Sequence, residues 1–230
     1  MKILAAVMCH NTPETSDNIR QKLSPLIDVV VIDSGSSEDS RAKLADGVVY
    51  CENLFWTGCW KYAIELMEAA SADVLWVIGG DVVLSSEAED YIKSIESSLP
   101  FGCWHPVVDG ASRPLMQASN NPKIPVSVWH LEGIAMAVSK EAVSAFNVIP
   151  TDNQYGWGLD IWMCWKSWTS SQRNVLDGRV TIHHPKLRGY SSDSAHREMI
   201  QWFLKHVGPD YRDKLHYWSD DADYNRIGYV

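Results

Sequence analysis

The sequence lacks the features that define several classes of protein. Its 230 residues carry 20 Lys and Arg against 29 Asp and Glu, a net charge of −9. No basic cluster is present, so nucleic-acid binding is not expected. The five cysteines are widely spaced, odd in number and without a CxxC pair, which is typical of reduced thiols in a cytosolic protein and not of a disulfide framework.

Long apolar runs and glycine-rich phosphate loops are also missing. No apolar run approaches about 18 residues, so no membrane span is expected. The apolar stretch at 3–8 is too short for a signal peptide, and we expect a cytoplasmic location. Neither GxGxxG nor GxxxxGK[ST] occurs, so the sequence does not predict a dinucleotide or P-loop site.

The first 100 residues alternate between short apolar segments and amphipathic segments. The apolar segments predict strands at 2–9, 28–33, 48–50 and 73–78. The amphipathic segments predict helices at about 12–23, 36–45, 57–70 and 86–98, two of which begin with the capping signals Thr12-Pro13 and Ser86–Glu89. This alternation predicts a parallel sheet with helices on both faces.

The second half changes character. It predicts strands at 101–108, 123–130, 133–138 and 179–183, helices at 140–146, 160–168 and 192–207, and polar loops at 109–122 and 151–158. We therefore expect an α/β fold in a single domain spanning 1–230, with a mostly parallel central sheet and a mixed C-terminal half. The domain would consist of two continuous halves, residues 1–100 and 101–230.

Two strands end in an acid, and a later strand ends in histidine. Asp33 follows 29–32, Asp81 follows 74–78 and Gly79-Gly80, and His183-His184 close the strand at 179–183. Acids at the carboxyl ends of parallel strands lie where open α/β sheets bind ligands, and a carboxylate with a histidine can hold a divalent cation and, through it, a diphosphate. Each residue also has a structural alternative: Asp33 as a helix cap, and either histidine as a hydrogen-bonded structural residue. Adjacent strand residues point to opposite faces, so at most one of the two histidines can reach the site.

A second group of candidates lies in the loop at 155–160. Trp157 stands between two glycines and could form the floor of a sugar site. Asp160, at the start of a predicted helix, could deprotonate an acceptor hydroxyl or simply cap the helix. Glu132, just before a predicted strand, is a rival acid.

Together these motifs resemble the GT-A-fold glycosyltransferases, and most closely the family 2-like group with some viral members. The resemblance covers most of residues 1–205. It rests on the order of five motifs: the strand and turn at 30–39, the segment at 53–58, the strand end at 79–81, the Gly-Trp-Gly loop with its acid at 156–160, and His184-Pro185 with Gly189-Tyr190. The sequence departs from the family in having Gly79 in place of the first DxD acid, and a single acid, Asp160, after the Gly-Trp-Gly loop.

The resemblance implies a hexosyltransferase that moves a sugar from a nucleoside diphosphate to a hydroxyl with Mn²⁺ or Mg²⁺. Residues 1–100 would then form its nucleotide-binding half and residues 101–230 its acceptor-binding half. Because some family members are viral, the resemblance also allows that this is a viral protein acting in the cytoplasm of its host. Asp81 and His184 would hold the metal, and Asp160, with Glu132 as rival, would be the base of an inverting displacement. The remaining expected contacts are to the nucleotide, by His10, Asn11, Asp33, Ser34 and Gly80, and to the sugar or acceptor, by Lys61, His130 and Trp157.

Three other hypotheses remain open. A nucleotidyltransferase would carry a glycine-rich basic loop where this chain has Cys9–Pro13. An inactive nucleotide-sugar or glycan-binding module, or an α/β domain with no glycosyl role, would fit the missing DxD acid. A UDP-linked donor is expected by family analogy alone. The donor sugar and the acceptor, whether a glycan or another hydroxyl, are open.

Overall fold

The computed structural model describes residues 1–230 except 45, 110–115, 118–122, 186–190 and 217–230. The strands are β1 (Ile3–Cys9), β2 (Asp28–Ser34), β3 (Val48–Cys51), β4 (Val74–Gly79), β5 (Val83–Leu84), β6 (Cys103–Asp109), β7 (Pro125–Val128), β8 (Ala137–Ser139) and β9 (Asn174–His183). The helices are α1 (Pro13–Leu23), α2 (Glu38–Arg41), α3 (Phe55–Ala69), α4 (Ala88–Ser98), α5 (Lys140–Phe146), α6 (Leu159–Thr169), α7 (Ser192–His206) and α8 (Tyr211–Leu215), with a 3₁₀ turn, η3, at Gly133–Ala135.

One sheet runs through both halves of the chain. Among the described residues its order is β3-β2-β1-β4-β8-β6-β9-β5, and β7 also pairs with β9. The pairs within β3-β2-β1-β4 are parallel, whereas β8 joins β4 and β6 antiparallel. The sheet is therefore mostly parallel in its first half and mixed in its second, as the sequence predicts.

The central strands carry the core. Every residue of β1 and β4 is buried, which explains why these strands read as unbroken apolar runs and not as alternating ones. Trp76 is fully buried and donates its indole N–H to the Ala135 carbonyl at 3.0 Å. Its ring also packs against Tyr91 and Trp104, with centroids 5.4 and 6.1 Å away.

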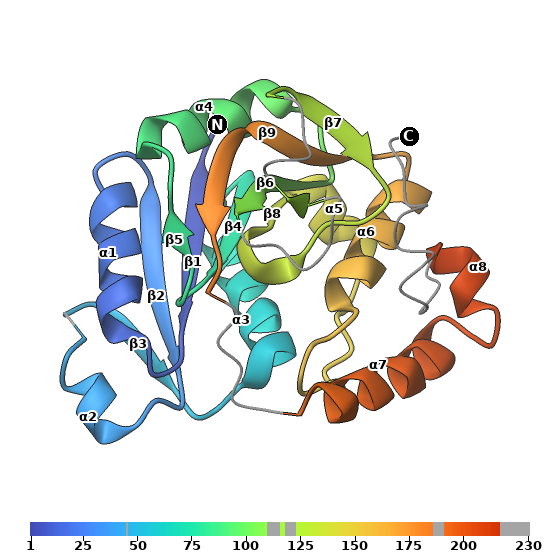
Figure 1. Cartoon of the computed structure of the whole chain (residues 1–230), viewed down its shortest axis with the longest axis horizontal. Coiled ribbons are helices and arrows are strands. Elements are labelled where there is room, and N and C mark those ends of the chain that lie inside the picture. The colour runs from blue at the N-terminus through green and yellow to red at the C-terminus, as the bar shows by residue number, and fades with distance from the viewer. Residues whose placement is uncertain (45, 110–115, 118–122, 186–190, 217–230) are drawn as a thin grey trace.

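The helices leave the sheet toward two sides of the molecule. Figure 1 shows α1 and α2 on one side and α6, α7 and α8 on the other. No described helix is long and apolar enough to cross a membrane. The loops that connect the strands to these helices carry the side chains that meet at the carboxyl ends of β1, β2 and β4.

The second half differs from the sequence prediction in two places. The segment 133–138 forms the η3 turn followed by the short strand β8, because the Trp76 indole takes up the Ala135 carbonyl in place of a strand partner. The last strand begins at Asn174 and not at Arg179, since residues 174–177 pair with both β6 and β7. Its interior charge, Asp177, is fully buried and paired with Arg179 at 2.6 Å.

The helix starts also differ from the sequence signals. The Ser86–Glu89 capping box does not form: α4 begins at Ala88, and the Ser86 hydroxyl instead accepts the Thr181 N–H of β9 at 3.0 Å. Tertiary pairing with β9 thus replaces a local cap. The predicted helix at 36–45 is only the single turn α2, capped by the Ser37 hydroxyl.

Candidate functional site at the carboxyl ends of β1, β2 and β4

The candidate site lies where parallel strands on either side of β1 end together. β1 pairs with β2 through Cys9 and Asp33, and with β4 through Met8 and Gly79. The chain therefore leaves β1 at a point flanked by strands on both sides, the position at which open α/β sheets bind ligands.

Asp81 and His184 meet although 103 positions separate them in sequence. Asp81 Oδ2 lies 3.2 Å from His184 Nε2, and the side chains are 23% and 20% exposed. They meet because the short strand β5 pairs antiparallel with the end of β9, Val83 opposite His183. His183 points elsewhere, toward Asp109 at 3.6 Å, as the alternation of strand side chains requires.

Asp81 and His184 fit a metal held jointly with a nucleotide. Among the described residues no group of three or more His, Cys, Asp or Glu side chains could hold a metal ion. A carboxylate and an imidazole supply two ligands, and a divalent cation in such a site takes its others from phosphate oxygens and water.

The two glycines before Asp81 each have a packing reason. A Cβ on Gly79 would lie 3.1 Å from Asp81 Oδ1 and 3.4 Å from the Ile134 carbonyl of η3. A Cβ on Gly80 would approach Thr12 Oγ1 and Ser16 Oγ of α1 within 2.6 Å. Gly79, where the first acid of DxD is missing, thus lies between the Asp81 side chain and the η3 turn.

The loops after β1 and β2 are tied together. His10 Nδ1 lies 2.7 Å from the Ser34 carbonyl. Asn11, in the left-handed region at φ 56°, donates its N–H to Ser36 Oγ at 2.8 Å and accepts the Ser37 N–H at 2.9 Å. These contacts bring together His10, Asn11 and Ser34, three of the residues expected to contact a nucleotide.

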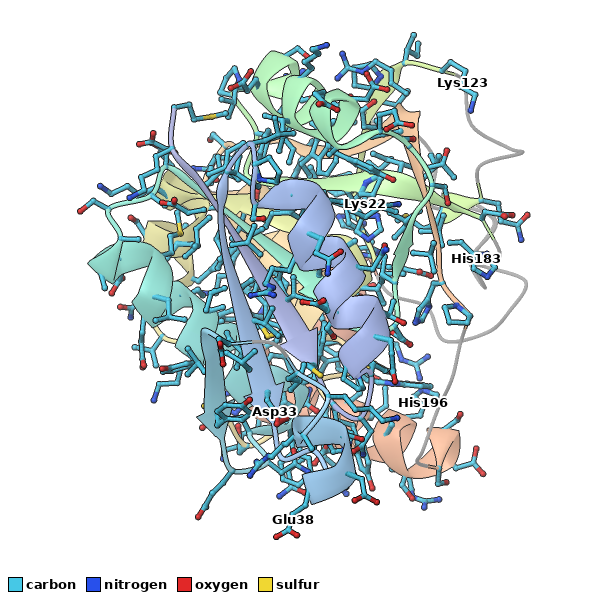
Figure 2. All side chains as sticks on the ribbon, turned by 90° about the vertical axis from the view of Figure 1, so that its left-hand side faces the viewer. Lys22, Asp33, Glu38, Lys123, His183 and His196 are labelled. Atoms are coloured by element: carbon cyan, nitrogen blue, oxygen red, sulfur yellow. The ribbon has the colours of Figure 1, made fainter. Side chains whose placement is uncertain are left out.

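Asp33 lies beneath this loop and not at its surface. Its side chain is fully buried; Oδ1 accepts the Ser36 N–H at 3.0 Å and Oδ2 accepts Arg41 Nε at 2.9 Å. In Figure 2, Asp33 and Glu38 lie near α2 at the lower end of the molecule. The expected direct contact of Asp33 with a nucleotide does not fit this arrangement, because the turn and Arg41 cover the carboxylate.

The two candidate bases are neighbours. Asp160 lies in the first turn of α6, where Oδ2 accepts the Gly133 N–H at 3.1 Å and Oδ1 accepts the Ile161 N–H at 2.9 Å. Glu132 directly precedes Gly133 and flanks η3. Both side chains belong to half-buried residues, and η3 connects them to Gly79 through Ile134.

Trp56 joins this group, although it was absent from the residues that the sequence singled out for chemistry. A Cβ on Gly133 would lie 3.5 Å from Trp56 Nε1, and one on Gly156 would lie 2.5 Å from Trp56 Cδ1. The indole thus lies between η3 and the loop that leads to Asp160. The signal for Trp56 in the sequence is the segment at 53–58, which also contributes to the family resemblance.

The loop before Asp160 is held by a buried asparagine. Asn153 Nδ2 donates to the Trp157 carbonyl at 2.8 Å, and Oδ1 accepts the Gly156 N–H at 2.9 Å. Its own carbonyl accepts the Thr57 hydroxyl from α3. Trp157 itself is half-buried, so this loop fixes the backbone on which both Trp157 and Asp160 depend.

Gly156→Ala should therefore destabilise the protein strongly. The added methyl group would clash with Trp56, and the residue has a positive φ of 72°. We expect the free energy of unfolding to fall by about 2–4 kcal/mol, measured by urea denaturation. Gly47→Ala is the matched control: it has φ 83° with no atom within 4 Å of the new Cβ, and we expect it to cost only about 1 kcal/mol. Equal losses in the two variants would show that contact with Trp56 contributes nothing.

Two of the expected sugar contacts have other partners. Lys61 is 54% exposed and lies 4.0 Å from Glu65 on α3. His130 is 5% exposed and its Nε2 contacts the Leu215 carbonyl at the end of α8. His130 therefore does not fit a sugar contact, because α8 covers it.

Two thiols near the ends of β2 and β3 have raised pKa values. Burial raises the pKa of Cys59 to about 11 and, to a lesser extent, the pKa of Cys51. All five cysteines are free. A thiolate nucleophile or metal ligand at this position is therefore disfavoured.

Asp152 ties the 151–158 loop to the end of α7. Its carboxylate contacts Lys205 Nζ at 2.5 Å and His206 Nε2 at 2.8 Å. Partial burial raises the pKa of Asp152, but the hydrogen bonds from Lys205 and His206 outweigh it, so the net shift is downward.

A lowered carboxyl pKa gives stability at higher pH. The contribution is fully present above the ordinary aspartate pKa of about 3.9 and is lost as the pH falls through the lowered pKa. Asp152→Asn should remove at most about 1 kcal/mol at pH 7, since the pair is partly exposed, and less at pH 2. Urea denaturation at both pH values tests this; an equal loss at pH 2 would contradict it.

This arrangement is a GT-A fold, and it matches two solved structures. The structure of GalNAc-T7 with UDP, GalNAc and Mn²⁺ matches with a TM-score of 0.65 at 13% identity, over 98% of this chain and 56% of that one. The mannosyltransferase PcManGT from Pyrobaculum calidifontis, in complex with GDP-Man and Mn²⁺, matches with a TM-score of 0.62 at 16% identity, over 94% of this chain and 68% of that one. No protein-family model and no curated protein sequence matches, and the chain spans little more than half the length of GalNAc-T7.

Proposed function

We propose that this protein is a glycosyltransferase that uses a nucleoside-diphosphate sugar and a divalent cation. The observation that carries the proposal is the approach of Asp81 and His184 to 3.2 Å at the end of β4, within a GT-A fold. The structural neighbours with this fold are glycosyltransferases crystallised with Mn²⁺ and with UDP or GDP-Man. That similarity supports the transferase class and a divalent metal.

The diphosphate would bind beside Asp81 and His184. A bound cation would offset the negative charge that develops on the diphosphate as the bond to the sugar breaks. His10 and Asn11 are hydrogen-bonded to the end of β2 and the turn after it. These two residues would orient the nucleoside, and the Gly80 backbone would lie beside the nucleoside. These residues bind and orient the leaving group and do not react themselves.

The acceptor would approach from the side of η3 and α6. Asp160 would accept the proton of the attacking hydroxyl, with Glu132 as the alternative base. The Gly133 N–H fixes one Asp160 oxygen, which holds the carboxylate in one orientation. A single base acting in line with the departing diphosphate would invert the anomeric configuration. Trp56, Trp157 and Lys61 would border the sugar and acceptor.

Calorimetric titration with UDP and with GDP, each with and without Mn²⁺, tests the proposal. We expect one nucleotide to bind only with Mn²⁺. Incubation with the corresponding nucleotide sugar should then release the nucleotide slowly, even without an acceptor, since water can replace the hydroxyl. Binding without hydrolysis would indicate an inactive binding module, and no binding of either nucleotide with Mn²⁺ would reject the proposed site.

A further inference from the structure

We propose that Arg41, and not Asp33, is the side chain that reads the nucleotide base, and that it favours uracil or guanine over adenine or cytosine. The inference rests on the proposed function and adds the class of nucleotide that the site selects. It also assigns Asp33 a different role, that of a positioning residue acting through Arg41.

The position of Asp81 determines where a base must lie. With the diphosphate at the end of β4, the nucleoside has to extend along the carboxyl edge of the sheet. On one side η3 lies beside the end of β4, where a Cβ on Gly79 would be 3.4 Å from the Ile134 carbonyl. On the other side β1, β2 and β3 follow in order. At about 4.8 Å per strand, the ends of β2 and β3 lie where the base would arrive.

Asp33 ends β2 but offers nothing to a base. Its side chain is fully buried, and each carboxylate oxygen already accepts a hydrogen bond, from the Ser36 N–H and from Arg41 Nε. Because the turn and Arg41 together cover this carboxylate, a base could reach it only if Arg41 and the turn moved away. That movement would leave a buried charge without its partner, which is strongly unfavourable.

Arg41 is held in place and still accessible. Nε donates to Asp33 at 2.9 Å and Nη2 donates to the Cys51 carbonyl at the end of β3 at 3.0 Å. The guanidinium therefore bridges the ends of β2 and β3, and its side chain is 37% exposed. Within the part of the chain that the structure describes, no hydrogen bond or ion pair engages Nη1. Tyr50, 51% exposed, lies under the guanidinium with its ring centroid 5.7 Å away.

A fixed guanidinium selects by hydrogen-bond polarity. It carries donors only, so it favours a base edge that presents a carbonyl oxygen. Uracil and guanine have a carbonyl where cytosine and adenine have an amino group, which is a donor. An amino group facing Nη1 would oppose donor with donor, and binding of adenine or cytosine nucleotides would be weakened.

Calorimetry with Mn²⁺ and each of UDP, GDP, ADP and CDP tests the inference. For the wild type we expect UDP or GDP to bind at least about tenfold more tightly than ADP and CDP, the value of one hydrogen bond to a charged group. In Arg41→Ala the ratio should fall to about one. Arg20→Ala is the matched control: Arg20 is also bound to an aspartate, Asp17, and to a backbone carbonyl, that of Asp46, but lies outside the proposed site. Its selectivity should be unchanged.

If Arg41→Ala does not fold, a second variant tests the same inference. Asp33→Asn with Arg41→Gln removes both charges together, and thermal melting verifies that it folds. Because the readout is a ratio of affinities within one preparation, it does not depend on the folded fraction. Selectivity retained without Arg41, or a wild type that binds all four nucleotides equally, would overturn this inference while leaving the proposed function in place. A wild type that binds no nucleotide with Mn²⁺ would overturn both.

Discussion

Replacing either Asp81 or His184 with alanine is expected to weaken Mn²⁺-dependent nucleotide binding by about 100-fold or more. Even partners outside the metal's own ligands are worth 10–100-fold in metal sites, and this site has only these two side chains to offer among the described residues. The measurement is calorimetric titration of each variant with the nucleotide that the wild type binds, with and without Mn²⁺.

His183→Ala is the control for this prediction. His183 is the sequence neighbour of His184 and also faces a carboxylate, Asp109, at 3.6 Å, but it points away from Asp81. We expect its nucleotide affinity to equal that of the wild type. Equal losses of nucleotide affinity in the His183 and His184 variants would mean that both histidines support the structure of the end of β9. That result would contradict the assignment of His184 as a metal ligand. Thermal melting of all the variants separates loss of binding from loss of folding.

Asp160→Asn should lower kcat for sugar transfer by about 10²–10⁴, the usual contribution of a general base, with little change in nucleotide affinity. Asparagine can still accept the Gly133 N–H that Asp160 Oδ2 accepts at 3.1 Å, and only the Ile161 N–H of the same helix turn loses its acceptor. The backbone arrangement should therefore survive while the base is lost. Initial rates over a range of nucleotide-sugar and acceptor concentrations, together with calorimetry of the nucleotide, test this.

Glu132→Gln tests the rival base in the same assay. Glu132 adjoins Gly133 and so lies beside the same η3 turn as Asp160. If Asp160 is the base, Glu132→Gln should retain most of kcat. If Glu132→Gln loses kcat by two orders of magnitude or more and Asp160→Asn does not, the roles are exchanged and the assignment of Asp160 is wrong.

The first half of the fold could be predicted because its signals are local. The strands β1 and β4 are apolar throughout and lie buried on both faces. The length of each apolar segment and the residues that flank it therefore identify these strands without knowledge of their neighbours in the sheet. The alternation with helices then predicts parallel pairing, which the structure confirms. The second half contains antiparallel pairs whose partners are distant in sequence, and local patterns carry no information about which strands pair.

The candidate site shows the same division. The sequence places acids at the ends of β2 and β4 and a histidine at the end of β9. It does not show the pairing of β5 with β9 that brings His184 to Asp81. It equally misses Trp56, whose role depends on the close approach of Gly133 and Gly156.

Burial separates the residues that the sequence could not tell apart. Asp33 and Asp81 follow similar apolar strands, yet Asp33 is fully buried beneath Arg41 and Asp81 is 23% exposed. His130 and His184 are similar as sequence candidates, yet α8 covers His130. The sequence by itself determined the succession of strands and helices along the first half of the chain and the residue types at the strand ends, because these follow from local hydrophobic period. Only the tertiary structure decided which end-of-strand groups are accessible and which are paired, because that depends on contacts between segments up to 103 positions apart.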